Sequence, residues 1–154
     1  MSRVTQILIA GAPSSPMTLL NEVRAVPGKG LEGDRYFSGS GTFSPKPQKP
    51  DFEITFVEGE KIAAFARESG LPFNSLLARR NIVTEGVPLN DLVGEEFRVG
   101  EVRMRGVRLC EPCNHLAKAS FPEILKGLIH KAGLRAQIIS EGMIHVGDLI
   151  RKEQ

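Results

Sequence analysis

The sequence contains no tryptophan and a single tyrosine, and phenylalanine, with eight residues among 154, supplies its other aromatic side chains. Aromatic packing therefore cannot dominate the core, which must consist mainly of Val, Ile and Leu. β-Branched residues pack well on pleated surfaces, so the composition favours strands. A chain of this length fits one domain, residues 1–154, and can bury a core without a disulfide or a metal.

The sequence also lacks an excess of charge of either sign. Its 20 Lys and Arg residues against 18 Asp and Glu residues give a formal net charge of +2, without any run of five basic residues. This argues against a nucleic-acid partner, which needs a basic face. The basic residues instead form local clusters, at Arg79–Arg80 and at Arg103, Arg105 and Arg108. Such clusters suit a small anionic ligand better than a polyanion.

Long hydrophobic runs are missing as well. No apolar stretch approaches the roughly 20 residues of a membrane-spanning helix, so we expect no membrane association. The apolar run VTQILIAGA, residues 4–12, leads into a second strand pattern, which argues against a signal peptide. With two cysteines and no secretion signal, we expect a reducing, cytoplasmic environment.

Short strand patterns dominate the chain. We predict strands over residues 4–10, 19–26, 52–57, 79–84, 95–109 (two strands joined at Val99–Gly100–Glu101), 134–140 and 143–151, the last two joined as a hairpin at Glu141–Gly142. Helix patterns cover residues 58–70 and 121–133, and the glycine- and proline-rich segment 38–51 predicts an exposed loop. Many short strands with one or two helices indicate a mainly β, barrel-type fold rather than a βαβ sheet.

The segment GKGLEGDRYF, residues 28–37, combines three glycines with Asp34 and Arg35. Glycine allows tight turns and a close approach of the backbone to a ligand. An arginine fork binds anions through paired hydrogen bonds, so the segment fits an anion site at Arg35. It also fits a glycine-rich turn that carries a surface ion pair. It is not a phosphate-binding P-loop, because no Gly-Lys-Ser/Thr follows.

Two arginines begin the predicted strand in ARRNIVTEG, residues 78–86. Neighbouring side chains of a strand point to opposite faces, so Arg79 and Asn81 would share one face while Arg80 points to solvent or to another strand. Arg79 and Asn81 could then offer a guanidinium and an amide to one polar ligand. The alternative is an exposed strand edge guarded by charge.

The two cysteines, Cys110 and Cys113, lie in RLCEPCNHL, residues 108–116. Their spacing allows a disulfide, a redox pair, or two small buried hydrophobic residues. With His115 and either His130 or His145 it also allows a zinc site. A cytoplasmic setting argues against the disulfide, and the absence of a second C-x-x-C argues against zinc. A thioredoxin-like pair would need βαβ surroundings, which the sequence does not predict.

A reactive or metal-binding thiol is a further interpretation of the same segment. Pro112 restricts the backbone just before Cys113, which indicates a shaped loop at a strand end. A thiol placed there would lie near Arg108 and could start a short helix in NHLAK, a setting typical of reactive cysteines.

Four segments occur in a fixed order, and together they resemble the MOSC domain family, named for the C-terminal part of molybdenum cofactor sulfurases. They are GLEGDRY (30–36), RRNIVTEG with PLNDLVGEEFRVG (79–100), RLCEPCNHL (108–116) and GLRAQIISEGMIHVGD (133–148). The resemblance covers nearly the whole chain and is strongest to the small stand-alone bacterial members. It implies a closed β-barrel of complex topology with a few peripheral helices.

The resemblance also implies a cofactor site. It implies binding of a molybdenum cofactor of the molybdopterin type, or a role in handling its sulfur. In metal-bearing relatives a cysteine in an x-Pro-Cys setting binds molybdenum, which implies that Cys113 is both the catalytic residue and the metal ligand. The family's G-D-R and R-x-N elements correspond to residues of this chain, and with Arg108 they form the expected pterin-binding set: Gly33, Asp34, Arg35, Arg79 and Asn81.

The implied activity is that of an oxidoreductase that reduces N-hydroxylated compounds with electrons from a separate donor protein. One alternative is a non-catalytic carrier that presents a cysteine-bound cofactor or sulfur species to a partner enzyme, and another is a small barrel that has lost the cofactor. Many relatives carry His-Gly-Gly after the G-D-R element, where this chain has SGSGTFSPKPQKP, residues 38–50. We therefore expect the loop Ser38–Pro50 to lie at the cofactor mouth, to be mobile, and to alter the substrate contacts.

Overall fold

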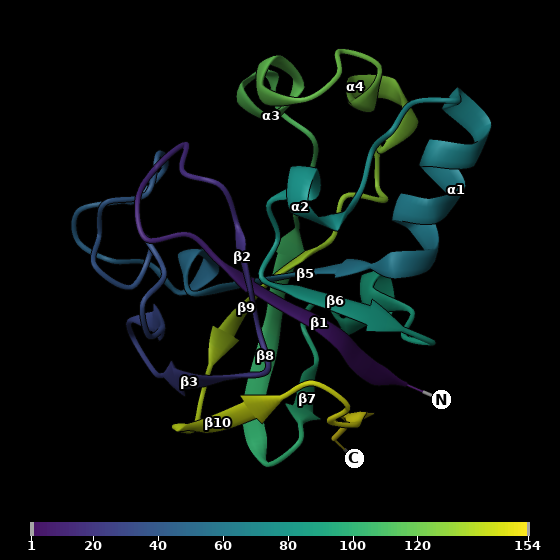
Figure 1. The fold of residues 1–154 in the computed structure, drawn as a ribbon. Coiled ribbons are helices and arrows are strands. Elements are labelled where there is room, and N and C mark those ends of the chain that lie inside the picture. Colours follow the sequence, from purple (N-terminus) through teal and green to yellow (C-terminus); the bar gives the residue numbers. More distant parts are fainter. Residues whose placement is uncertain (1, 154) are drawn as a thin grey trace.

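A computed structural model describes residues 2–153 of the chain (Figure 1). Its strands are β1 (Arg3–Ile9), β2 (Thr18–Leu20), β3 (Glu22–Val26), β4 (Gly30–Leu31), β5 (Ile54–Glu58), β6 (Ile82–Glu85), β7 (Glu96–Val99), β8 (Val102–Leu109), β9 (Leu134–Ile138), β10 (Gly142–His145) and β11 (Ile150–Lys152). Its helices are α1 (Gly59–Ser69), α2 (Ser75–Ala78), α3 (Asn114–Ala119) and α4 (Ile124–Gly127), with 3₁₀ turns η1 (Pro50–Phe52) and η2 (Leu89–Leu92). The fold is mainly β, as predicted. None of the helices in residues 2–153 has the length and apolar character to cross a membrane.

Eight strands form one sheet in the order β11-β7-β8-β9-β5-β6-β1-β2, and β10-β3-β4 form a second. Strands β5 and β6 pair in parallel because α1 and α2 lie in the connection between them, which allows the chain to cross over. The other pairs of both sheets are antiparallel. The large sheet curls strongly, so side chains on its inner face meet one another.

The closed barrel implied by the family resemblance is wrong for this chain. The large sheet is a curled half-barrel whose order ends at β11 and β2. Near the two chain ends, β1 meets the segment before β11 only at an isolated bridge between Arg3 and Leu149. The bridge is flanked by hydrogen bonds such as that from Val4 N to Asp148 O, at 2.9 Å. Strand β11 forms its ladder with β7 and not with β1, so the sheet does not close.

Two apolar clusters stabilise the fold. The first lies inside the curled sheet, where the rings of Phe56 and Phe97 meet edge to face with centroids 5.6 Å apart. The small sheet contributes Val23 and Ile144 to the same cluster and so covers the open side of the curl. The second cluster lies on the outer face, where α1, α3 and α4 pack over β1, β5 and β6 (Figure 1). The helices therefore gather at one end of the sheet.

Several predicted elements differ from the observed ones. The predicted hairpin at Glu141–Gly142 is wrong, because β9 pairs with β5 and β8 whereas β10 pairs with β3 in the other sheet. The predicted helix 121–133 shortens to α4, because the backbone leaves the helical region at Leu128, with φ −112° and ψ 13°, and His130 follows with a positive φ of 58°. The predicted strand over 79–84 begins only at Ile82, because Arg79 caps α2 with a φ of 56°.

Candidate functional site

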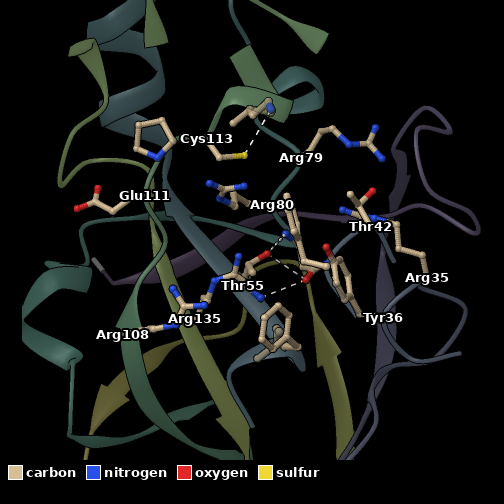
Figure 2. A pocket seen from close by; sticks show the side chains of 16 residues that line it. Arg35, Tyr36, Thr42, Thr55, Arg79, Arg80, Arg108, Glu111, Cys113 and Arg135 are labelled. Atoms are coloured by element: carbon tan, nitrogen blue, oxygen red, sulfur yellow. Dashed lines mark hydrogen bonds between the residues drawn. The ribbon is translucent and has the colours of Figure 1, made fainter. Parts of the chain in front are cut away.

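A single pocket brings together most of the residues that the sequence predicts to be functional (Figure 2). It encloses about 310 Å³ between the end of the curled sheet and the start of α3. Five arginines line it: Arg35, Arg79, Arg80, Arg108 and Arg135. The thiol of Cys113 lies at its upper rim in Figure 2, above the guanidinium of Arg80. The pocket is therefore strongly cationic and carries one soft nucleophile.

The two cysteines have different surroundings. Cys113 is half-buried, lines the pocket and caps α3, where its Sγ accepts a hydrogen bond from Leu116 N at 3.5 Å. Cys110 is 1% exposed, does not line the pocket, and its backbone N donates to Gly133 O at 2.8 Å. Both are free thiols, so the disulfide interpretation is not supported.

The predicted short helix at NHLAK is confirmed as α3, whose first residue follows Cys113. The zinc interpretation finds no support, because no group of three His, Cys, Asp or Glu suited to a metal occurs among the residues that the structure describes. The side chain of His115, one candidate zinc ligand, lies outside the described part of the chain. Cys113 is thus the one cysteine thiol among the residues that line this pocket.

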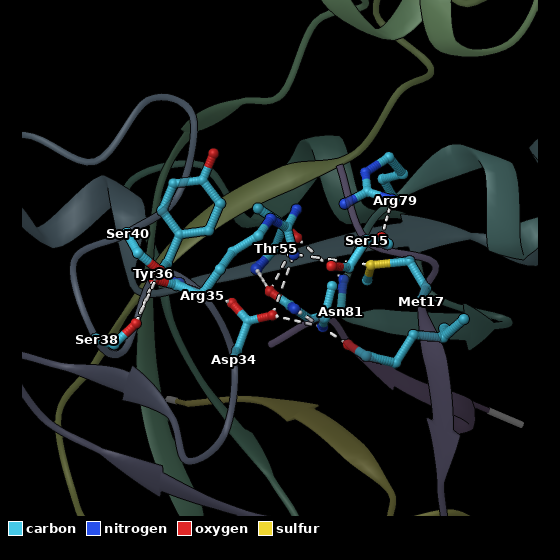
Figure 3. A network of polar contacts seen from close by, with 12 residues as sticks. Ser15, Met17, Asp34, Arg35, Tyr36, Ser38, Ser40, Thr55, Arg79 and Asn81 are labelled. Carbon is cyan, nitrogen blue, oxygen red and sulfur yellow. Dashed lines mark hydrogen bonds and ion pairs between the residues drawn. The ribbon is translucent and has the colours of Figure 1, made fainter. Parts of the chain in front are cut away.

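The Asp34–Arg35 pair is buried and not a surface ion pair (Figure 3). Arg35 Nη1 donates to Asp34 Oδ1 at 3.1 Å, and Ala10 N donates to the same oxygen at 3.1 Å. Arg35 also lies 4.9 Å from the ring centroid of Tyr36 and lines the pocket. Asp34 therefore fixes the direction of Arg35. Gly33, with a φ of 90°, makes the turn before this pair and does not itself line the pocket.

Arg79 and Arg80 both line the pocket, which corrects the prediction that Arg80 points to solvent or another strand. Strand alternation does not apply here, because Arg79 precedes β6 in a left-handed conformation. Arg79 Nη1 donates to Ser15 O at 2.7 Å, and Arg80 Nε donates to Ala132 O at 2.9 Å. Each guanidinium is thus oriented by a backbone carbonyl and keeps further donors. Burial lowers the pKa of Arg79, and the nearby charge of Arg35 lowers it further. An anion bound beside the two guanidiniums would therefore offset their mutual repulsion.

Asn81 is buried and its amide joins three strands. Its Oδ1 accepts from Thr55 N and Thr55 Oγ1, both at 3.1 Å, and its Nδ2 donates to Leu8 O at 3.1 Å. Although Asn81 lines the pocket, most of its hydrogen-bonding capacity is used within the fold. Its clearest role is to hold β1, β5 and β6 in register beneath the arginines.

Arg108 and Arg135 form the opposite end of the pocket from Arg35 and Arg79 (Figure 2). Arg108 Nε pairs with Asp51 Oδ2 at 2.8 Å. Burial acts to raise the pKa of Asp51, but its hydrogen bonds and the charges of Arg108 and Arg135 lower it below its ordinary value. Both guanidiniums lie beside the ring of Phe52, at 5.9 and 4.9 Å from its centroid.

Sequence reasoning missed several lining residues. They are Tyr36, Phe52, Arg80, Glu111 and Arg135. Glu111 is a carboxylate that lines the pocket, and both its oxygens are engaged by His130: Oε1 by the backbone N and Oε2 by Nδ1, each at 2.7 Å. A signal for Arg135 existed in the GLRAQII strand, where an arginine interrupts an apolar pattern one position after the strand starts.

The geometry defines a class of small domain, a curled, mainly β sheet with a cationic, thiol-bearing pocket at one end. The chain belongs to the MOSC domain family, whose model matches residues 34–151. MOSC domains are associated with molybdenum cofactor binding. No curated protein sequence gives a significant match to the chain.

Solved structures share the fold. YuaD from Bacillus subtilis superposes with a TM-score of 0.79 at 18% identity, over 100% of this chain and 98% of that one. YiiM from Geobacillus stearothermophilus gives 0.76 at 17% identity, over 100% of this chain and 76% of that one. YiiM from Escherichia coli gives 0.72 at 20% identity, over 99% and 70% respectively. At these identities the likeness concerns the fold alone.

Proposed function

We propose that this pocket binds a molybdenum cofactor of the molybdopterin type and that the protein reduces N-hydroxylated compounds. The observation that carries the proposal is the placement of one free thiol, Cys113, in a pocket lined by five guanidinium groups. A thiolate is a soft ligand suited to a metal such as molybdenum, and guanidinium groups bind phosphate through paired hydrogen bonds. The residues present thus fit both ends of such a cofactor.

The chain's own residues would share the binding as follows. Cys113 would be the thiolate ligand of the metal, oriented by its position at the start of α3. Arg35 and Arg79 would bind the terminal phosphate, because they lie near enough for the charge of Arg35 to act on Arg79, and the one carboxylate beside them, Asp34, pairs with Arg35 alone. Asp34 and Asn81 would position these arginines and the strand ends beneath them and would not contact the cofactor directly.

When bound, the cofactor would supply the two-electron reduction of the N–O bond, with the electrons coming from a separate donor protein. The protein's contribution would be to orient the cofactor and to control access. The loop after Arg35 supplies Thr42 and Phe43 to the pocket wall, so it lies where a substrate would enter. This supports a role of that loop in substrate contacts.

A carrier function is the second candidate, and the accessibility of Cys113 favours it. A half-buried thiol at a pocket rim could present a persulfide to a partner enzyme without any turnover of its own. The carrier and the reductase would use the same cysteine and differ in what the purified protein contains.

The test is to purify the protein from a host that makes the cofactor and to measure molybdenum, persulfide and reductase activity. We expect stoichiometric molybdenum with activity, and loss of both in Cys113→Ser. Cys110→Ser is the matched control and should retain most of the metal, since Cys110 does not line the pocket. Persulfide without metal would favour the carrier, and equal losses in both variants would contradict the role of Cys113.

A further inference from the structure

Two arginines face each other across the β8–β9 pair at the bottom of the pocket. In the antiparallel register, Arg108 lies directly opposite Arg135. Like charges placed opposite each other in a sheet are destabilising. The carboxylate of Asp51 forms a salt bridge with Arg108. Arg135 donates only to the backbone oxygen of Asp51, at 3.3 Å. Arg135 Nε is buried without a hydrogen-bond partner.

The same sheet contains a second pair of opposed arginines, which serves as an internal comparison. Arg98 lies opposite Arg103 in the β7–β8 register. There, Glu153 pairs with both guanidiniums, and Glu96 also pairs with Arg103 at 2.9 Å. This fold therefore neutralises opposed arginines with carboxylates on its outer surface. In the pocket, Asp51 forms a salt bridge with Arg108 and acts on Arg135 only through its charge, so one carboxylate serves two guanidiniums. Arg135 forms no salt bridge among the described residues, which leaves part of the positive charge of the pair available to a ligand.

An aromatic surface lies beside the pair. The ring of Phe52 is 4.9 Å from the guanidinium carbon of Arg135 and 5.9 Å from that of Arg108. The ring of Tyr36 lies next to it, with centroids 6.2 Å apart and planes inclined by 34°. Flat aromatic groups stack well on such rings, and a carboxylate on their edge could reach the two guanidiniums. The surroundings therefore match a planar ligand that carries a negative charge.

This cluster is separate from the Arg35–Arg79 group. Figure 2 shows Arg35 and Arg79 on one side of the pocket and Arg108 with Arg135 on the other, with Arg80 between them below Cys113. The pocket thus has two cationic ends on either side of the thiol. A single terminal phosphate occupies only one of them.

We propose that Arg108 and Arg135, together with Phe52, form a subsite for an aromatic carboxylate, so that the substrates of this protein carry a negatively charged, planar end. The anion subsite follows from the sheet register and the contacts alone, whereas its assignment to the substrate rests on the proposed function. Arg108, predicted from sequence to bind the cofactor, is thereby assigned to the substrate end.

The test uses benzoate as the probe and benzamide as its neutral counterpart of nearly the same shape, with binding to the full chain measured by calorimetry. Benzoate should bind the wild type more tightly than benzamide does. Arg135→Gln and Arg108→Gln should each weaken benzoate at least about tenfold and leave benzamide unchanged. Arg105→Gln is the matched control, because Arg105 lies on β8, pairs with Glu96 and does not line the pocket.

Three results would overturn the subsite: equal affinities for benzoate and benzamide, unchanged benzoate binding in both pocket variants, or an equal loss in Arg105→Gln. Arg108 is exposed, so its variant should fold even if removal of the more buried Arg135 disturbs β9. Because these measurements need no metal, they remain valid if the protein retains no molybdenum and the proposed function fails.

The anion bound by Arg108 and Arg135 could be a substrate carboxylate or the phosphate of the cofactor, and cofactor retention by variants distinguishes the two. If Arg135→Gln releases molybdopterin while Arg79→Gln retains it, the pair binds the phosphate of the cofactor and the assignment to the substrate is wrong. If Arg135→Gln keeps the cofactor, kcat/KM for the para-carboxylate derivative of N-hydroxybenzamidine should fall at least about tenfold more than kcat/KM for N-hydroxybenzamidine itself. Equal effects on the two compounds would overturn the proposal.

Discussion

Arg79 adopts a backbone conformation that L-residues rarely use. Its φ of 56° lies in the left-handed region, at the end of α2. This conformation costs roughly 1–2 kcal/mol for a residue with a side chain, and such costs are often retained at functional positions. The position directs the guanidinium toward Ser15 and the neighbourhood of Arg35 (Figure 3). Strain and pocket position together indicate that the side chain is kept for binding.

We therefore predict that Arg79→Gly separates binding from stability. Glycine accepts the left-handed conformation, so the variant should unfold at the same or a higher urea concentration than the wild type. It should still lose molybdopterin affinity by about tenfold or more, because one charge-assisted phosphate contact is gone. Urea unfolding and molybdopterin content measure the two effects. Arg80→Ala should cost less affinity, and an equal loss would show that the phosphate lies between both arginines.

At the scale of single residues, the sequence identified the pocket's main side chains but not their geometry. Arg35, Arg79 and Cys113 all line the pocket as the motifs indicated. Arg79 and Asn81 both line the pocket, as predicted. Strand alternation is not the reason, because it holds only inside a strand and Arg79 caps a short helix. Arg135 was missed because it is the second residue of β9 and points away from the core. Only the packing of η1 against that face turns it into a pocket wall.

At the scale of elements, β8 depends on a glycine. The segment after η2 crosses β8 at Gly106, which donates to Glu95 O at 2.9 Å and accepts from Gly94 N at 2.8 Å. A Cβ at this position would lie 1.9 Å from the backbone oxygen of Leu92. This distance is far inside van der Waals contact, so the two backbones must separate before any side chain fits.

We predict that Gly106→Ala lowers the free energy of unfolding by about 3 kcal/mol or more, since backbone atoms cannot move aside as a flexible side chain does. Gly11→Ala is the control, because a Cβ at Gly11 would meet nothing within 4 Å beyond its chain neighbours, and the φ of Gly11 is not positive. It should change stability by less than about 0.5 kcal/mol. Denaturant unfolding of both variants gives the comparison, and similar losses would refute the crossing argument.

Glu53 joins three elements just before β5. Its Oε1 accepts hydrogen bonds from Gly28 N in the β3–β4 turn and from Ile138 N at the end of β9, both at 3.1 Å. Burial raises its pKa above the ordinary value of 4.5, although these two hydrogen bonds act in the opposite direction. The folded protein therefore favours the protonated carboxyl, and this contribution to stability is lost as the pH rises through the folded-state pKa.

Glu53→Gln should consequently gain stability relative to the wild type as the pH rises from below 4.5 toward neutrality. The glutamine oxygen can accept the same two hydrogen bonds, and it cannot ionise. The difference in unfolding free energy between variant and wild type, measured between pH 4 and pH 8, should become more favourable to the variant as the pH rises. Glu101→Gln, in the exposed turn between β7 and β8, controls for the loss of one charge. A difference that does not change with pH would contradict the burial argument.

The sequence predicted most strands but not their partners. Alternation located β1, β5, β7, β8 and β9 within a few residues, since each has one face in the core. Pairing depends on contacts between distant segments, which local patterns do not contain. The Glu141–Gly142 turn illustrates this, because it sends the chain from the large sheet to the small one and does not form a hairpin.

At the scale of the whole molecule, the segment from Ser38 to Lys49 forms the entrance of the pocket. Its start is held by Ser38 and Ser40, whose hydroxyl groups donate to the backbone oxygen of Arg35 at 3.1 and 3.3 Å. Beyond this anchor it contributes Thr42 and Phe43 to the pocket wall and has no helix or strand of its own. Its predicted position beside the site agrees with the structure, and its mobility stays a prediction.

We predict that replacing residues 41–48 by a tight turn changes substrate preference or rate while the protein still folds and retains molybdenum. The shortened loop keeps Ser38 and Ser40, whose hydroxyl groups bond to the backbone oxygen of Arg35, so the Arg35 end of the pocket should be preserved. Steady-state kinetics on a small and a bulky substrate, with molybdenum content, would measure this. A folded variant without cofactor would show that the loop belongs to the cofactor site. Slow hydrogen exchange of its amides would show that it does not open as a lid.

The bridge between Arg3 and Leu149 has a consequence for how the protein is made. A ribosome releases β1 long before the residues around Leu149, which one edge of that strand meets. Its partner on the other edge, β6, also lies far away, since Arg3 pairs with Glu85, and the nearby β2 pairs only with residues 7–9. Until those residues have been made, the first residues of β1 lack partners along their edges. Unpaired strand edges can pair with other chains. The nascent chain is therefore more prone to aggregation than the folded protein, in which these edges are paired.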